Sequence, residues 1–376
     1  MKKVLLFCFA LIAFSMPMNF VQANSQSKLF GTSDYPQIEM IIEEIYSSNI
    51  DEVKNRTAGS AGELFFANVL SEQLDLLGLT YLQDKTSYLE EFSISETKSS
   101  QNVVGFKDNG SQNYVVIGAH YDAVYKQNSF GFNDNLSGVV GVLNLVQKII
   151  SEENDFNIIT IFYGAEEAGC LGSKFFLSQL ADEIKNNILL SINFDSIGGG
   201  DNLYYFHTDY PTAYGIALDN IAQNNIFNIT KPGFNRHFSS LFNNDFNYTS
   251  VCLCSDNSSY IKYGINSVLF FSGDLDAFNG LGFYEKAGHS RIMHNTDTEQ
   301  TNLEVFGNVF YENIQNTVDY CFDFLSSDEF NEENFFAGQI NTALYSDFTL
   351  KIVGIIFIAL MLAGFFITIN LIYKKK

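Results

Sequence analysis

Two histidines and three carboxylates in this chain are of the residue types that hold zinc. They are His120, Asp134, Glu167, Asp195 and His294. Zinc accepts imidazole nitrogen and carboxylate oxygen, and in catalytic sites it keeps one position open for water. Glu166 stands beside the third of these residues, where a general base could take a proton from such a water. If the side chains converge, the sequence predicts a metallohydrolase.

Three of these positions follow short apolar runs that are typical of buried strands. The runs cover 114–119, 157–163 and 188–194. They lead to His120, to the Glu166–Glu167 pair and to Asp195. Ligands of open α/β sheets bind outside the carboxyl ends of the strands. We therefore expect these side chains to meet at one edge of a sheet.

Each residue also has a structural explanation when it is taken alone. A histidine after a strand is usually a satisfied core or surface residue, and we interpret His207 and His237 in that way. An aspartate before a helix often caps it, as Asp134 could do for a helix starting near Leu136. The order of all the residues, each at a strand end or a loop, favours the metal site.

Several motifs occur in a fixed order along the chain. They are Arg-Thr-Ala-Gly-Ser at 56–60, His-Tyr-Asp at 120–122, Gly-Phe-Asn-Asp-Asn-Leu-Ser-Gly at 131–138, Ala-Glu-Glu-Ala-Gly-Cys-Leu-Gly-Ser at 165–173, Asn-Phe-Asp at 193–195 and His-Asn-Thr-Asp-Thr at 294–298. In order and spacing the set resembles the dizinc exopeptidases typified by bacterial leucine aminopeptidases. Glutamate carboxypeptidases and glutaminyl cyclases are relatives of that family.

The resemblance implies a set of five ligands for two zinc ions. His120 and Asp195 would hold one ion, Glu167 and His294 the other, and Asp134 would bridge them. A water shared by the two ions would be the nucleophile, since bound zinc lowers the pKa of water and polarises a scissile carbonyl.

The resemblance also implies the roles of neighbouring residues. Glu166 would take the proton of the water and deliver it to the departing amine. Asp122 would accept the other ring N–H of His120, and the peptide between Asp134 and Asn135 would be cis. We expect Glu166 and Glu167 to point to opposite sides, as consecutive side chains of an extended segment do.

Two features depart from the family pattern. Ser255-Asp256-Asn257 stands where many relatives have a histidine after the aspartate. The stretch between His294 and Asp297 is one residue shorter than expected, and His289, five residues before His294, is a rival ligand. We prefer His294 because the Asn-Thr-Asp-Thr that follows it continues the motif.

The coarse pattern predicts an α/β fold with a mainly parallel mixed sheet and helices on both faces. Further strands are expected over 102–106 and 265–271, and a turn at Asp108-Asn109-Gly110 joins the first of them to 113–119. Helices are expected over 38–46, 63–77, 137–150, 173–184 and 301–324. With 46% hydrophobic residues the chain can bury a large core, and its formal charge of −22 argues against nucleic acid as a partner.

Both ends of the chain carry membrane signals. Residues 1–23 read as a signal peptide, followed by a zinc peptidase domain over 24–328 and a polar stalk over 329–349. Residues 350–373 include an uncharged run, Ile352–Tyr373, that is long enough to span a bilayer. The lysines at 374–376 form a cytoplasmic tail. We expect a single-pass protein whose catalytic domain lies outside the cytoplasm.

Cleavage of the signal peptide leaves four cysteines, which allow three disulfide pairings. They are Cys170, Cys252, Cys254 and Cys321. The resemblance makes Cys254 the preferred participant in a disulfide, and we interpret Cys170 as a packed small residue.

The favoured function is a membrane-anchored zinc aminopeptidase that acts on peptides with a free N-terminus. A zinc carboxypeptidase would need an arginine for the substrate carboxylate, and the chain offers only Arg56, Arg236 and Arg291. A glutaminyl cyclase would use a single zinc ion, and a non-catalytic ectodomain would use the fold for binding alone. The preferred N-terminal residue and the oligomeric state stay open.

Overall fold

The structure is a computed structural model of the 376-residue chain. It describes residues 35–124, 126, 129–200, 202–207, 213–223, 227–230, 255–273 and 292–331. The predicted signal peptide, the run at 352–373, His237, His289, Cys252 and Cys254 lie outside these residues. Among the helices that are described, none combines the length and the apolar character needed to cross a membrane.

The described strands form one eight-stranded mixed sheet in the order β1-β2-β4-β3-β5-β8-β6-β7. They are β1 (Leu89–Ser95), β2 (Lys98–Lys107), β3 (Tyr114–His120), β4 (Asn157–Tyr163), β5 (Ile188–Phe194), β6 (Asn202–Phe206), β7 (Ile229–Thr230) and β8 (Ser267–Gly273). The central strands β4, β3, β5 and β8 are parallel. Antiparallel partners flank them: β2 pairs with β1 and β4, and β6 pairs with β8. The predicted mixed α/β sheet is confirmed.

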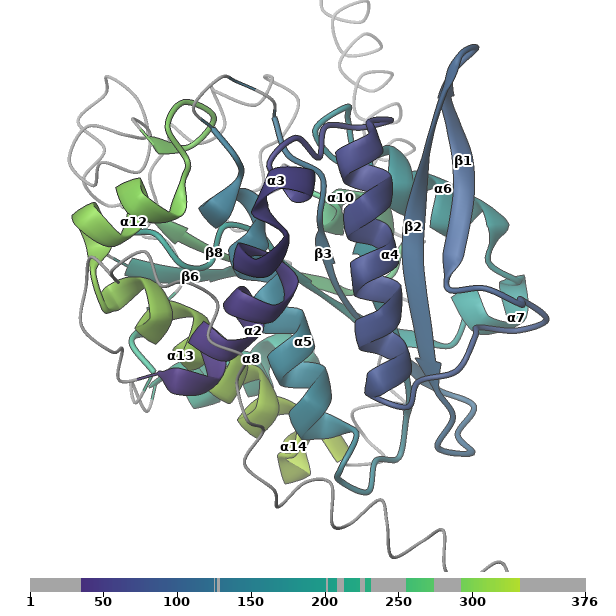
Figure 1. Ribbon diagram of the computed structural model, residues 1–376. Coiled ribbons are helices and arrows are strands. Elements are labelled where there is room, and N and C mark those ends of the chain that lie inside the picture. The colour runs from purple at the N-terminus through teal and green to yellow at the C-terminus, as the bar shows by residue number, and fades with distance from the viewer. Residues whose placement is uncertain are drawn as a thin grey trace, which may run out of the picture. The chain divides into compact units, whose positions relative to one another are not determined.

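Helices cover both faces of the sheet, as predicted (Figure 1). One face carries α2 (Pro36–Ile45), α4 (Ala61–Leu76), α5 (Gly138–Ile149), α8 (Ala213–Gln223) and α13 (Val309–Leu325). The other face carries α6 (Leu171–Gln179), α7 (Asp182–Lys185) and α10 (Asn257–Lys262). Shorter elements are η1 (Ser47–Asn49), α3 (Ile50–Val53), η2 (Phe132–Ser137), α12 (Glu299–Phe306) and α14 (Asp328–Asn331).

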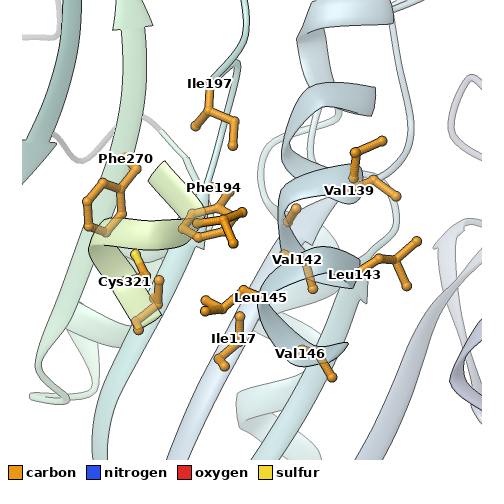
Figure 2. Close-up of a cluster of buried hydrophobic side chains, with 14 of the residues drawn as sticks. Ile117, Val139, Val142, Leu143, Leu145, Val146, Phe194, Ile197, Phe270 and Cys321 are labelled. Atoms are coloured by element: carbon orange, nitrogen blue, oxygen red, sulfur yellow. The ribbon is translucent and has the colours of Figure 1, made fainter. Parts of the chain in front are cut away.

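Residues 115–119 of the central strand β3 are apolar, as is usual for a strand whose two faces are both buried. Val115 and Ile117 pack into the larger core cluster with α5, whereas Val116 between them packs into the cluster of α6 and α10. Figure 2 shows side chains of α5, among them Leu145, facing Phe194 of β5 and Cys321 of α13. This packing fixes the position of β3 in the sheet, and therefore the position of His120 at its end.

The start of α4 is built by a capping arrangement in the entry motif. The side chain of Ser60 accepts the Glu63 amide at 3.1 Å, and the Glu63 carboxylate accepts the Gly59 amide at 2.6 Å. The first bond satisfies an amide that the helix leaves without a partner, and the second ties the residue before the N-cap to the first turn. The arrangement also anchors the chain that leads from Arg56 into α4.

Several predicted elements differ in detail. The helix expected over 173–184 is split into α6 and α7, because Leu180 adopts an extended ψ of 133°. The helix expected over 301–324 is split into α12 and α13 at Gly307, whose φ is +54°. The turn at 108–110 joins β2 to β3, but β4 lies between these strands.

The described fold continues to the start of the segment predicted as a stalk. Phe330 in α14 is fully buried and packs edge-on against Phe156 and Phe324. Residues up to Asn331 thus belong to the fold, while 332–349 lie outside the described residues.

Candidate metal centre

The predicted convergence at the strand ends is present. In the sheet order β4-β3-β5, His120 is the last residue of the middle strand and pairs with Tyr163 of β4. Glu166 and Glu167 follow β4 on one side, and Asp195 follows β5 on the other. His120 therefore lies between the two carboxylate-bearing segments.

The five candidate ligands form two clusters that share Asp134. In the first, His120 Nε2 lies 3.3 Å from Asp134 Oδ1 and 3.7 Å from Asp195 Oδ1. In the second, His294 Nε2 lies 2.7 Å from Asp134 Oδ2 and 3.3 Å from Glu167 Oε1. Within each cluster the donor atoms lie within 4.8 Å of one another. The two oxygens of Asp134 thus face different histidines.

The segment η2 that carries Asp134 is held through its backbone. The peptide between Asp134 and Asn135 is cis, as the resemblance implied. The buried carboxylate of Asp297 accepts the amides of Asn133 and Asp134, each at 2.8 Å. Asn135 Oδ1 accepts the amide of Ser196 at 3.0 Å, which ties η2 to the loop after β5. Asp297 belongs to the His-Asn-Thr-Asp-Thr motif, so the motif that supplies His294 also positions Asp134.

Arg56 is buried beneath the same loops. Its guanidinium donates to the carbonyls of Tyr121, Phe130 and Gly131. The group also lies over the rings of Tyr46 and Phe66, 5.8 and 5.5 Å from their centroids. Arg56 therefore joins the segment after β3 to the segment before Asp134.

Asp122 lies beside the second ring nitrogen of His120, where the resemblance places it. His120 Nδ1 is 3.2 Å from the Asp122 carbonyl oxygen and 3.5 Å from its Oδ1. The Asp122 carboxylate also accepts the amides of Glu166 and Glu167, at 2.9 and 3.2 Å. One buried carboxylate thus orients an imidazole and the backbone of both glutamates.

The expectation that Glu166 and Glu167 sit in extended chain is wrong. The carbonyl of Glu166 accepts the amides of Gly169 and Cys170, both at 2.7 Å, so the pair opens a tight turn. Successive side chains of such a turn point about 100° apart. Glu167 faces His294, while Glu166 Oε1 accepts the Cys170 thiol at 3.4 Å.

The crowding of carboxylates shifts their protonation. Burial, reinforced by the charge of Asp134, raises the pKa of Glu167 to about 7. Burial also raises the pKa of Glu166 well above its usual range, and the charges of Asp256 and Asp195 add to this effect. Burial opposes ionisation of Asp134, but hydrogen bonds from His120 and His294 outweigh it and lower its pKa.

The histidines respond in the opposite sense. A hydrogen bond to Asp134 and the nearby carboxylate of Glu167 raise the pKa of His294 to about 11. Burial lowers the pKa of His120, but the charge of Glu166 and bonds to neighbouring carboxylates raise it well above its usual value. The site therefore attracts positive charge, whether as protons on the imidazoles or as metal cations.

The donor set fits zinc. Glu167 Oε1 is buried and forms no hydrogen bond, although His294 Nε2 is only 3.3 Å away. A metal ion between a carboxylate oxygen and an imidazole nitrogen satisfies both atoms. Mixed nitrogen and oxygen ligands suit zinc, whereas magnesium and calcium prefer oxygen alone.

A sequence model of peptidase family M28 matches residues 102–312, which is more than half of the chain. The chain belongs to peptidase family M28. The matched range contains Glu166 and all five candidate ligands, so the resemblance drawn from the motifs is confirmed at the level of the family.

Individual relatives of this M28 chain are distant. A probable leucine aminopeptidase 2 from Arthroderma benhamiae is 28% identical over 189 residues, which cover 48% of this chain and 35% of that protein. The chain thus spans about a third of the length of the curated leucine aminopeptidases that it matches.

Solved structures share the fold at low identity. The aminopeptidase LapA of Legionella pneumophila is 18% identical with a TM-score of 0.52, over 85% of this chain and 80% of that one. A glutaminyl cyclase of Porphyromonas gingivalis is 16% identical with a TM-score of 0.53, over 75% and 96%. These likenesses show a zinc exopeptidase fold for the M28 chain.

Other predicted residues lie outside the two clusters. His207 is buried with its Nε2 3.2 Å from Asp219 Oδ1, which agrees with its interpretation as a satisfied core histidine. Cys170 is a half-buried free thiol, and Cys321 is a buried one. Asp256 is fully buried near Glu166, where the sequence indicated only a departure from the family pattern.

The positioning roles of Asp297, Asn135 and Arg56 were not predicted. Each residue stood inside a recognised motif, but a motif does not tell which backbone groups its side chains will meet. For Arg56 the nearest available signal was its place just before the Ser-x-x-Glu capping pattern at 60–63.

Replacement of Arg56 by lysine should lower the free energy of unfolding by about 2–5 kcal/mol. A lysine ammonium cannot reach three carbonyls in one plane, and each buried carbonyl left without a donor costs about 1–3 kcal/mol. Urea denaturation measures the change. The control is Lys54→Ala, whose side chain is 45% exposed and pairs with the exposed Asp51; it should stay within about 0.5 kcal/mol of the parent. Equal effects of the two substitutions would contradict the role of Arg56.

Proposed function

We propose that this M28 chain is a dizinc aminopeptidase that releases N-terminal residues from peptides. One observation carries the proposal above all: the two oxygens of Asp134 face His120 and His294, in two separate donor clusters. A bridging carboxylate between two ions requires this arrangement. His120 and Asp195 would hold one zinc ion, and Glu167 and His294 the other.

The residues of the chain divide the reaction between them. When bound, the zinc ions supply electrostatic activation of water and polarise the scissile carbonyl. Glu166 removes the proton from the attacking water and transfers it to the departing amine. Burial raises the pKa of Glu166, which makes its carboxylate a stronger proton acceptor than a solvated glutamate. Asp122 keeps His120 in one tautomer and holds the amide of Glu166.

Carboxypeptidase action is less well supported than aminopeptidase action. A substrate carboxylate is usually bound by an accessible arginine. Among the described residues the one arginine is Arg56, which is 1% exposed and committed to backbone carbonyls. The acidic site instead favours a substrate with a positively charged N-terminus.

Replacement of Glu166 by glutamine should lower kcat on aminoacyl amides by about 100- to 10,000-fold. The amide cannot take up the proton, while the ligand Glu167 is left intact, so zinc content should equal that of the parent. Steady-state kinetics and elemental analysis measure the two quantities. Glu96→Gln is a matched control in an exposed turn and should be unchanged. Full activity of Glu166→Gln would show that Glu166 is not the base.

Replacement of single candidate ligands should affect the binding of the two ions differently. Asp195→Ala should release one equivalent of zinc, because Asp195 touches the His120 cluster alone. Asp134→Ala should weaken the binding of both ions, because the two oxygens of Asp134 face different clusters. Zinc titration with a chromogenic chelator measures the stoichiometry. A parent protein that binds one zinc ion and cyclises an N-terminal glutamine would instead indicate a glutaminyl cyclase.

We also propose that the peptidase domain is exported and held at a membrane by the run Ile352–Tyr373. The support is its length without charge and the lysines that follow it. A chain that ends at Ser346 should be soluble without detergent and should keep the kcat of the full chain. A requirement for detergent in the truncated chain, tested by sedimentation, would contradict the anchor.

A further inference from the structure

A buried asparagine outside the metal clusters joins the two ends of the loop that carries Glu166 and Glu167. Asn102 lies in β2 and is fully buried. Its Oδ1 accepts the Gly164 amide at 3.2 Å, and its Nδ2 donates to the Gly172 carbonyl at 2.9 Å. Gly164 follows β4 directly, and Gly172 lies in the first turn of α6. One side chain therefore binds the residue where the loop begins and the residue where it ends.

The neck of this loop, formed by Gly164 and Gly172, is closely packed. The Gly172 amide donates to the Gly164 carbonyl at 3.1 Å, so the two ends are also bonded to each other. A Cβ atom added at Gly172 would lie 2.4 Å from Asn102 Oδ1 and 2.4 Å from the Gly164 carbonyl oxygen. Glycine at this position thus lets the two ends and the carboxamide of Asn102 come together in a closed ring of hydrogen bonds.

The chain beyond the neck adopts an unfavourable conformation. Ala165 and Cys170 have φ values of +53° and +54°. In this left-handed region the Cβ atom of an L-residue comes too close to the following carbonyl oxygen. Such residues persist only where the surrounding structure holds them. Hydrogen bonds from outside the loop therefore help to keep the turn that opens with Glu166.

Asp122 and Asn102 hold this loop at different places. The carboxylate of Asp122 accepts the amides of Glu166 and Glu167 within the turn. Asn102 instead binds the neck and ties it to β2. Asp122 alone would fix two peptide groups but not the distance between the ends of the loop. Asn102 fixes the ends, and so sets where the turn lies with respect to the sheet.

We propose that Asn102 is a positioning residue for the peptidase reaction. By closing the neck of the loop, it places Glu167 for its zinc ion and Glu166 for the attacking water. The inference rests on the proposed function, in which Glu166 is the base and Glu167 a zinc ligand. The ion of Glu167 depends on Asn102, whereas the ion of His120, at the end of β3, does not. Asn102 itself touches neither substrate nor metal.

The first test uses the full chain with the substitution Asn102→Ala, which removes both bonds to the neck. At saturating zinc we expect kcat on an aminoacyl amide to fall by about tenfold or more, because a small misplacement of a reacting group is costly. KM should stay within about threefold of the parent. A residue that only stabilised the fold would lower the unfolding midpoint and leave kcat per folded molecule unchanged.

Asn157 offers a matched control, because it makes the same pair of bonds at the opposite end of β4. Its Oδ1 accepts the Asn109 amide at 2.8 Å, its Nδ2 donates to the Ser111 carbonyl at 2.7 Å, and it is also buried. Asn157→Ala should lower the urea midpoint of unfolding about as much as Asn102→Ala does. It should keep kcat within about threefold of the parent. An equal loss of kcat in the two variants would overturn the proposal.

Zinc binding tests which ion depends on Asn102. Asp195→Ala leaves the ion of Glu167, and Glu167→Ala leaves the ion of His120. Adding Asn102→Ala to the first variant should weaken the remaining ion by about tenfold or more, as is usual when a group that orients a ligand is lost. Adding it to the second should change the affinity by less than about threefold. Competition with a chromogenic chelator measures both, and equal weakening in the two would contradict the positioning of Glu167.

A second substitution covers the case in which Asn102→Ala does not fold. Asn102→Ser keeps a polar side chain, but its single hydroxyl is too short to reach both ends of the neck. It should show the same loss of kcat and the same selective loss of zinc affinity. Parental values for Asn102→Ser would then overturn the proposal.

The outcomes also separate this proposal from the proposed function. Parental kcat and zinc affinity in Asn102→Ala would overturn the role of Asn102 and leave the peptidase assignment standing. If the parent binds zinc but cleaves no peptide, the zinc affinities still decide whether Asn102 positions Glu167. A parent that neither binds zinc nor cleaves would overturn both proposals.

Discussion

The mutual repulsion of buried carboxylates at the ends of β3, β4 and β5 is the constraint on which this site depends. Asp122 and Asp134 are buried, Asp195, Glu166 and Glu167 are largely so, and all lie around two imidazoles. Buried charges of one sign are costly unless opposite charge or hydrogen-bond donors offset them. The arrangement must therefore be held together by the surrounding backbone and completed by cations. The hold of the backbone is visible in the contacts of the site, and the two donor clusters offer places for cations.

The carboxylates that are not candidate ligands act on the backbone. Asp122 and Asp297 each accept amides of the loops that bear the candidate ligands. Arg56 does the converse and donates to carbonyls of those loops. Irregular backbone cannot satisfy its own amides and carbonyls as a helix or sheet does. Side chains that supply the missing partners let sharply turned loops persist in a buried place, and ligands on such loops keep a defined geometry.

The positions of the ligand-bearing segments could be predicted because they follow from local patterns. An apolar run bounded by Gly118-Ala119 and a polar His120 signals a strand end by itself. The order of the strands could not be predicted in this way. The turn at 108–110 joins β2 directly to β3 in the chain. In the sheet, however, β4 pairs with both strands and lies between them. Such pairing depends on long-range packing of the two faces.

Helix boundaries and loop geometry could not be predicted for a related reason. Gly307 breaks the last long helical pattern, but an isolated glycine inside such a pattern is often tolerated. The short strands β6 and β7 carry too few residues for a clear alternation. The placement of the segment that carries Asp134 depends on Asp297, which comes from a motif more than 160 residues away. Spacing in the sequence holds no information on that contact.

The two adjacent glutamates show how one turn can give two carboxylates different chemistry. Glu167 lies against His294, and both belong to one of the two donor clusters. Glu166 lies toward Asp256 and Asp195, and its Oε1 receives only the weak thiol donor of Cys170. Zinc at Glu167 would keep that carboxylate ionised, because metal binding requires the deprotonated ligand. Glu166 feels the same burial without being a candidate ligand, which supports the proposal that Glu166 is the base. The division follows from the neighbours that the turn gives to each glutamate, His294 for Glu167 and Cys170 for Glu166.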